Sequence, residues 1–140
     1  MRGGRLNLQI LLVEDDPGDV VLVREALQES RHVEDIRVAH DGVQALEQLR
    51  DRRRALPDLV LLDLNLPRKD GREVLGEIRR DPRLTHLPVV VLTTSDAQSD
   101  VVRSYELHAN AYVTKPVDLQ RFLGAVREID RFFLGLVELP

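Results

Sequence analysis

Acidic, hydroxyl and basic side chains follow several short apolar runs of this sequence, at the positions where those runs end. Glu14 and Asp15 come directly after LQILLV, and Asp63 ends DLVLLD. Thr93 ends PVVVLT, and Lys115 comes directly after AYVT. Carboxylates resist burial, so each acid marks either a solvated strand end or a charged site. If the runs are parallel strands, their carboxyl ends meet at one edge of a sheet and these side chains converge there.

Such a group of side chains suits a hard cation and phosphoryl chemistry. Clustered carboxylates raise one another's pKa unless a cation compensates, and Mg²⁺ takes oxygen ligands from one or two carboxylates. Once the charge is neutralised, a carboxylate such as Asp63 can attack phosphorus as a nucleophile. The Thr93 hydroxyl can donate to an added phosphoryl oxygen, and Lys115 supplies a further positive charge. Taken singly, an acid after a strand is as often a loop residue or a helix N-cap, and a threonine merely suits a strand.

The elements that would position these side chains alternate between strands and helices. Strands are expected at 8–13, 36–39, 58–63, 88–93 and 111–114. Apolar residues at helical spacing occupy the segments 18–30, 42–50, 71–80, 97–107 and the stretch from about 118 to 133. Three of the strands are continuously apolar, which is typical of strands covered on both faces. Five β–α units predict a parallel sheet with helices on both sides.

Length and composition restrict the class of protein further. The 140 residues fit one domain, and 43% hydrophobic with 31% charged residues is typical of a globular chain. A formal charge of -4 gives no electrostatic case for binding nucleic acid, and the absence of cysteine excludes disulfides and thiolate chemistry. The apolar run near the N-terminus breaks at Glu14, so it is too short for a signal peptide or a membrane span. A cytoplasmic protein of one domain is therefore expected.

Four segments carry a resemblance to a known family. They are ILLVEDD at 10–16, LVLLDLNLPRKDG at 59–71, PVVVLTTSD at 88–96 and AYVTKP at 111–116. From about Gln9 to Phe133 the chain resembles the response-regulator receiver domain of two-component signalling, the family of the single-domain chemotaxis regulator. The resemblance implies an α/β, flavodoxin-like (βα)5 three-layer sandwich with strand order 2-1-3-4-5. It implies a receiver domain at 8–134, between an N-terminal tail at 1–7 and a C-terminal extension at 135–140.

The resemblance assigns the acceptor and the metal ligands residue by residue. Asp63 would be the residue that is phosphorylated, and its carboxylate would also be a metal ligand. Asp15 would bind Mg²⁺ directly, Glu14 would act mostly through water, and Asn65 would lend its backbone carbonyl. Mn²⁺ is expected to substitute for Mg²⁺.

The remaining roles concern the response to phosphorylation. Thr93 would bind the phosphoryl group, and Lys115 would pair with it. Tyr112 would be the aromatic switch that turns inward when Thr93 moves, and the peptide bond before Pro116 would be cis. The fourth helix, fifth strand and fifth helix would then present a changed face.

The implied function is that of a single-domain response regulator, which accepts a phosphoryl group from a histidine kinase and is not a conventional enzyme. EDDPGD, LNLPRKDG and ELHANAYVTKP look most like the subgroup partnered with bacterial phytochrome kinases. Asp16 after the acidic pair, and His108 in place of a common glycine, depart from the commoner pattern without touching the phosphoryl chemistry. No DNA or membrane partner is expected.

Surplus aromatic residues near the C-terminus suggest self-association. Phe122, Phe132 and Phe133 are expected at a homodimer interface formed by the last helix and the tail. The alternative is a tail that folds back on its own sheet.

Two other functions stay open at this point. One is a receiver-like module that binds partners without phosphorylation, against which the intact Asp63, Thr93 and Lys115 argue. The other is a phosphohydrolase of the haloacid-dehalogenase kind, which also uses a strand-end aspartate. That family needs a second aspartate two residues further on, where this chain has Asn65.

Overall fold

The structure is a computed structural model that describes residues 8–28, 33–93, 109–115 and 118–129. Its centre is a five-stranded sheet in the order β2-β1-β3-β4-β5, with every neighbouring pair parallel. The strands are β1 (Leu8–Val13), β2 (Val33–Ala39), β3 (Leu59–Asp63), β4 (Val89–Thr93) and β5 (Ala111–Thr114). The strand order reverses between β1 and β3, which is where doubly wound folds bind ligands, at the carboxyl ends of the strands.

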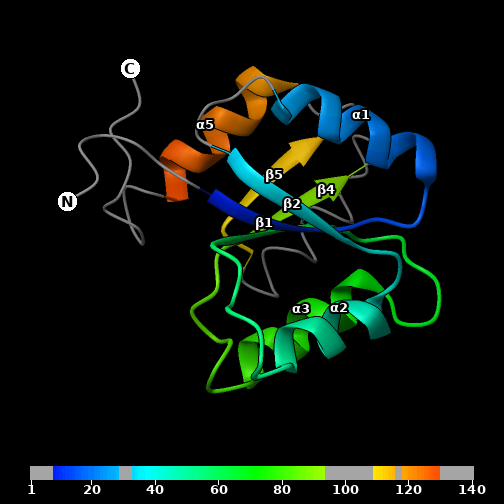
Figure 1. The fold of residues 1–140 in the computed structure, drawn as a ribbon, viewed down its shortest axis with the longest axis vertical. Coiled ribbons are helices and arrows are strands. Elements are labelled where there is room, and N and C mark those ends of the chain that lie inside the picture. The colour runs from blue at the N-terminus through cyan, green and yellow to red at the C-terminus, as the bar shows by residue number, and fades with distance from the viewer. Residues whose placement is uncertain (1–7, 29–32, 94–108, 116–117, 130–140) are drawn as a thin grey trace.

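The helices lie in two layers on opposite faces of this sheet (Figure 1). The described helices are α1 (Pro17–Gln28), α2 (Gly42–Arg50), α3 (Gly71–Arg80) and α5 (Leu119–Ile129). Helices α1 and α5 cover one face, and α2 and α3 cover the other. The predicted three-layer architecture and strand order are confirmed.

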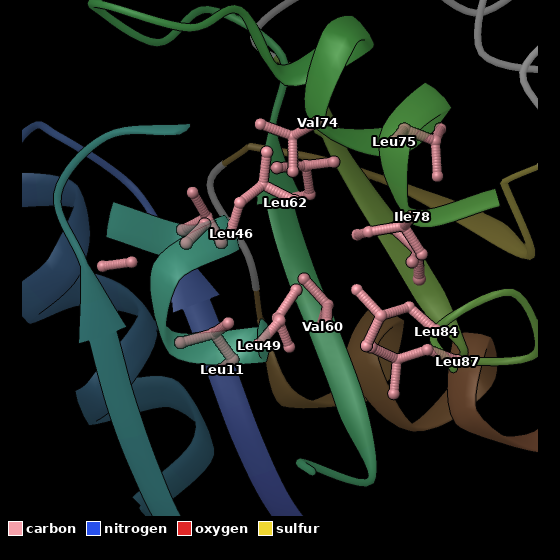
Figure 2. Packing of buried hydrophobic residues seen from close by; sticks show 14 of the residues in the cluster. Leu11, Leu46, Leu49, Val60, Leu62, Val74, Leu75, Ile78, Leu84 and Leu87 are labelled. Carbon is pink, nitrogen blue, oxygen red and sulfur yellow. The ribbon is translucent and has the colours of Figure 1, made fainter. Parts of the chain in front are cut away.

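Two hydrophobic clusters hold the layers together, one on each side of the sheet. Alternate strand residues point to opposite faces, so Leu61 packs in the cluster with α1 and α5 while Leu62 packs in the cluster with α2 and α3. Figure 2 shows the second cluster, in which Leu46 and Leu49 of α2 meet Val60 and Leu62 of β3 and the apolar side of α3. Burial on both faces explains why the central strands read as unbroken apolar runs.

The open edge of β2 is covered by side chains from both helical layers. The Ala39 carbonyl accepts a bond from the Glu14 backbone at 3.0 Å, so the carbonyls of Ile36 and Val38 face away from β1. Arg24 of α1 donates to Ile36 O at 3.2 Å, and Gln48 of α2 donates to Val38 O at 3.3 Å. Two outward carbonyls of this edge strand therefore have partners within the chain.

The expected elements agree with the observed ones, with one larger difference. Strand β2 begins at Val33 rather than at residue 36, because its first residues pair with β1 although Glu34 and Asp35 are exposed. The helix expected at 97–107 lies outside the described residues. Among the residues that the structure describes, no helix has both the length and the apolar character needed to cross a membrane.

Candidate functional site

Asp63 is the last residue of β3, and its side chain is buried at the carboxyl edge of the sheet. One carboxylate oxygen, Oδ1, accepts a bond from the Asn65 backbone N–H at 3.0 Å. The other oxygen, Oδ2, accepts a bond from Lys115 Nζ at 2.8 Å. The carboxylate is therefore fixed by one bond from its own loop and one from the segment after β5.

Glu14 directly follows β1 and is completely buried. Its Oε1 accepts a bond from the Asp16 backbone N–H at 3.2 Å, and its Oε2 accepts a bond from Lys115 Nζ at 2.5 Å. Burial raises the pKa of Glu14 to about 7, and the negative charge of Asp63 adds to the rise, against the lowering effect of the Lys115 bond. The buried Glu14 carboxyl is therefore harder to ionise than an exposed one, despite its bond to Lys115.

Lys115 joins the elements of the site. Its ammonium group contacts Glu14, Asp63 and Asp19, the last at 3.0 Å between Nζ and Oδ2. Burial by itself lowers the pKa of Lys115, but its bonds to Asp63 and Glu14 outweigh burial and raise the pKa above the ordinary lysine value. The lysine therefore stays charged throughout the physiological range of pH.

Asp19 is a site residue that the sequence analysis missed. The Asp16 side chain accepts the Gly18 N–H at 2.8 Å, and the Asp16 carbonyl accepts the Val20 N–H at 3.0 Å, so Asp16 caps α1. Pro17 suits the first helical position that follows such a cap. Asp19 then lies in the first turn of α1, facing Lys115. The motif DPGD signals the start of a helix, but no local signal places Asp19 beside a lysine 96 residues away.

Three carboxylates of the site are arranged to fit a divalent cation. Glu14, Asp15 and Asp63 each offer one oxygen, and these oxygens all lie within 4.8 Å of one another. Two of the three side chains are buried and Asp15 is exposed, so one side of the group is open to solvent. A hard oxygen donor set of this kind fits Mg²⁺ or Mn²⁺. These are the three side chains that the sequence analysis assigned to the metal.

The loop after Asp63 is closed by a tight backbone contact between its two ends and is held to the domain by a side-chain ion pair. A Cβ at Gly71 would lie 2.3 Å from the Asp63 carbonyl oxygen, so only glycine fits there. Arg68 has a positive φ of 64° and donates from Nη1 to Asp41 Oδ2 at 3.1 Å. Asp41 also caps α2 by accepting the Gln44 N–H at 2.8 Å. The loop is thus tied to the N-terminus of α2.

The other residues assigned by resemblance lie at the same edge or outside the described part. Thr93 ends β4 and pairs with Thr114 of β5, which places its backbone one strand from β3, although its side chain is not described. Asn65 is exposed beside Asp63. Tyr112 is half-buried and packs against the cluster of α2 and α3. Pro116 lies outside the described residues.

The expected dimer contact needs a correction at Phe122. Its side chain has no exposed surface and packs in the core between α5 and the sheet. A residue buried in its own chain has no surface to offer a second copy, so Phe122 does not belong to an interface. Phe132 and Phe133 lie outside the described residues.

Fold and site together define a doubly wound α/β domain whose switch point holds a buried carboxylate, a lysine paired with it and three close carboxylates that fit a divalent cation. The chain belongs to the response regulator receiver domain family, whose family model matches residues 10–127. It is thus a receiver domain of the kind that works in two-component signalling.

Three relatives illustrate the similarity. Response regulator Rcp1 of Synechocystis sp. is 47% identical over 94% of this chain and 92% of its own length. A crystal structure of Rcp1 in its Mn²⁺-bound form aligns over 94% of this chain and 99% of that one, with a TM-score of 0.71 and 43% identity. The bacteriophytochrome response regulator AtBRR aligns over 96% of both chains, with a TM-score of 0.81 and 41% identity. The phosphorylated cyanobacterial phytochrome response regulator RcpA gives a TM-score of 0.76 at 44% identity, over 96% of this chain and 99% of that one.

Proposed function

We propose that this chain is a single-domain response regulator that accepts a phosphoryl group from the phosphohistidine of a sensor kinase onto Asp63. The observation that carries the proposal is the burial of the Asp63 carboxylate together with the contacts that it makes. This carboxylate is buried at the strand end, is oriented by the Asn65 backbone and Lys115, and belongs to a group of three close carboxylates. No other carboxylate of this group combines burial with a place at the end of the central strand β3.

The transfer forms a P–O bond to Asp63 as the P–N bond of the phosphohistidine breaks, and the electron pair of that bond passes to the ring nitrogen. Positioning and charge compensation make up most of the catalysis of phosphoryl transfer. The two bonds to the Asp63 carboxylate supply the positioning before the donor arrives. Lys115 already contacts Asp63, so its positive charge lies within reach of an oxygen of a phosphoryl group on Asp63.

The cation site proposed here comprises Glu14, Asp15 and Asp63, with the backbone carbonyl of Asn65. When Mg²⁺ is bound, it offsets the repulsion between these carboxylates and an incoming phosphoryl group. Mn²⁺ is expected to substitute, and the Mn²⁺-bound form of Rcp1 supports this.

The kinase proposed as the partner is of the phytochrome type, because AtBRR and RcpA are phytochrome response regulators. We place the reaction in the cytoplasm, where such kinases would present their phosphohistidine. Phosphorylation adds about two negative charges and three acceptor oxygens at the strand edge. Thr93 would turn toward them and Tyr112 would follow, changing the face around β5. We also propose self-association through the C-terminal tail, by Phe132 and Phe133.

The test is phosphorylation in vitro. Wild type and Asp63→Asn are incubated with acetyl phosphate, or with a ³²P-labelled phytochrome kinase, with and without Mg²⁺, and incorporation is followed by intact mass and autoradiography. Label is expected only on wild type in the presence of Mg²⁺. Equal labelling of Asp63→Asn, or no labelling of wild type by either donor, would contradict the proposal.

A further inference from the structure

The hydrogen-bond donors of Lys115 are fully used in this structure. An ammonium group has three N–H donors, and Lys115 Nζ has three carboxylate partners, Glu14 at 2.5 Å, Asp63 at 2.8 Å and Asp19 at 3.0 Å. If Asp63 gains a phosphoryl group, the donor that now binds Asp63 can pass to one of the new oxygens. A second donor is available only if Lys115 releases Glu14 or Asp19.

These two partners differ in how readily they can be released. The Glu14 side chain is 1% exposed and that of Asp19 is 31% exposed. Without Lys115, Glu14 would be left as a buried acid without its strongest partner, which is costly. Asp19 has the longest of the three contacts, and water can take the place of Lys115 at its carboxylate. Asp19 is therefore the partner whose bond to Lys115 breaks first.

Asp19 also stands apart from the cation-binding group. The oxygens that lie within 4.8 Å of one another come from Glu14, Asp15 and Asp63, and Asp19 is not part of that group among the described residues. Its contact in the site is with the lysine, so it acts on the other carboxylates through Lys115.

We propose that Asp19 is a positioning residue that draws the Lys115 ammonium toward α1 and competes with the phosphoryl group on Asp63 for that ammonium. This inference depends on the proposed function of Asp63. With Asp19 present, the charge of Lys115 is shared, and the oxygens of Glu14 and Asp63 remain more available to a cation. Without it, Lys115 binds those oxygens more fully and has a donor free for an anion.

The two ligands of the site should therefore respond to loss of Asp19 in opposite directions. Affinity for Mg²⁺ should fall, because Lys115 occupies the carboxylate oxygens and one negative charge is gone. Affinity for a phosphoryl mimic should rise, because the Lys115 donor that Asp19 had held is free to bind the mimic. Loss of a bond to a charged, partly exposed group should change the Mg²⁺ affinity and the affinity for the phosphoryl mimic by about threefold to tenfold each. A merely structural defect would weaken both.

The experiment uses the full chain as wild type, Asp19→Asn and Glu25→Gln. Glu25 is an exposed acid on the same helix, so its replacement removes the same charge without touching Lys115. ¹H–¹⁵N NMR titrations give the Mg²⁺ affinity, and then the beryllofluoride affinity at Mg²⁺ concentrations that saturate each variant. The same spectra report whether each variant is folded.

The expected result is that Asp19→Asn binds Mg²⁺ more weakly and beryllofluoride more tightly, while Glu25→Gln matches wild type. If both affinities shift in the same direction, or if Asp19→Asn matches Glu25→Gln, the inference about Asp19 is overturned while the function proposed for Asp63 is not. A wild type that binds neither ligand would instead overturn the function proposed for Asp63.

Discussion

Replacing Lys115 by methionine removes the only cation that contacts Glu14 and Asp63 among the described residues, and the effect on stability can be worked out from their burial. Taking one partner from a buried ion pair costs about 3–5 kcal/mol, because the other charge is left without compensation. Glu14 can reduce this cost by taking up a proton. In wild type the pKa of Glu14 is about 7. The bond from Lys115 lowers this pKa, so replacing Lys115 would raise it further.

The pH dependence follows from the direction of that shift. A carboxyl whose pKa is raised in the folded state binds more protons when folded than when unfolded, so its contribution to stability decreases as pH rises. Below pH 7 Glu14 is mostly protonated in both proteins, and the loss of Lys115 then affects mainly Asp63. Above pH 7 only the variant keeps the proton, and the deficit grows by up to about 1.4 kcal/mol per pH unit. We expect a deficit of about 3–5 kcal/mol at pH 8 and about 1.4 kcal/mol less at pH 6.

The assay is urea unfolding followed by circular dichroism, at pH 6 and pH 8, in EDTA and in Mg²⁺. Bound Mg²⁺ should reduce the deficit, since a cation replaces the missing positive charge. Lys69→Met is the matched control, because the Lys69–Glu77 pair is less buried than that of Lys115 and Glu77 keeps its contact with Arg50, so a smaller loss of stability is expected. A Lys115→Met protein as stable as wild type at pH 8 in EDTA, or one without dependence on pH and Mg²⁺, would refute this reasoning.

Four further predictions test other parts of the domain. The apparent affinity for Mg²⁺ should be about tenfold weaker at pH 6 than at pH 8, because the cation must displace the proton held by Glu14, and a calorimetric titration that finds no difference would contradict this. Asp41→Ala should lower the free energy of unfolding by about 1–2 kcal/mol, because the side chain caps α2, and urea unfolding will measure it. Asn65→Arg should slow the loss of ³²P from the phosphorylated protein several-fold by obstructing the attacking water, whereas equal rates would discard the idea. Truncation after Arg131 should turn a dimer into a monomer in sedimentation, and monomers in both samples would end the dimer proposal.

The sequence predicted the fold well because each central strand is buried on both faces. Leu59 to Leu62 form an unbroken apolar run, which is typical of a strand covered on both faces. The helices beside them repeat apolar residues at helical spacing. The start of β2 was harder to predict, since Glu34 and Asp35 are exposed and carry no strand pattern. Phe122 was assigned to an interface although its place in the apolar stripe of the last helix already favoured the core, and there the assignment was wrong.

The site was predictable only in part. Parallel strands bring Glu14, Asp63 and Lys115 to one edge, and this could be deduced from the order of strands and polar residues. The number of partners of Lys115 could not, because it depends on how far a long side chain reaches from β5 and on the angle at which α1 leaves β1. Asp19 contacts the lysine through that geometry, for which the sequence gives no separate signal.

The covered edge of β2 bears on how this domain can associate with other proteins. Because Arg24 and Gln48 already occupy the carbonyls of Ile36 and Val38, a strand from another chain could pair there only after both contacts had broken. On that side the domain is therefore protected against growth into extended β-assemblies.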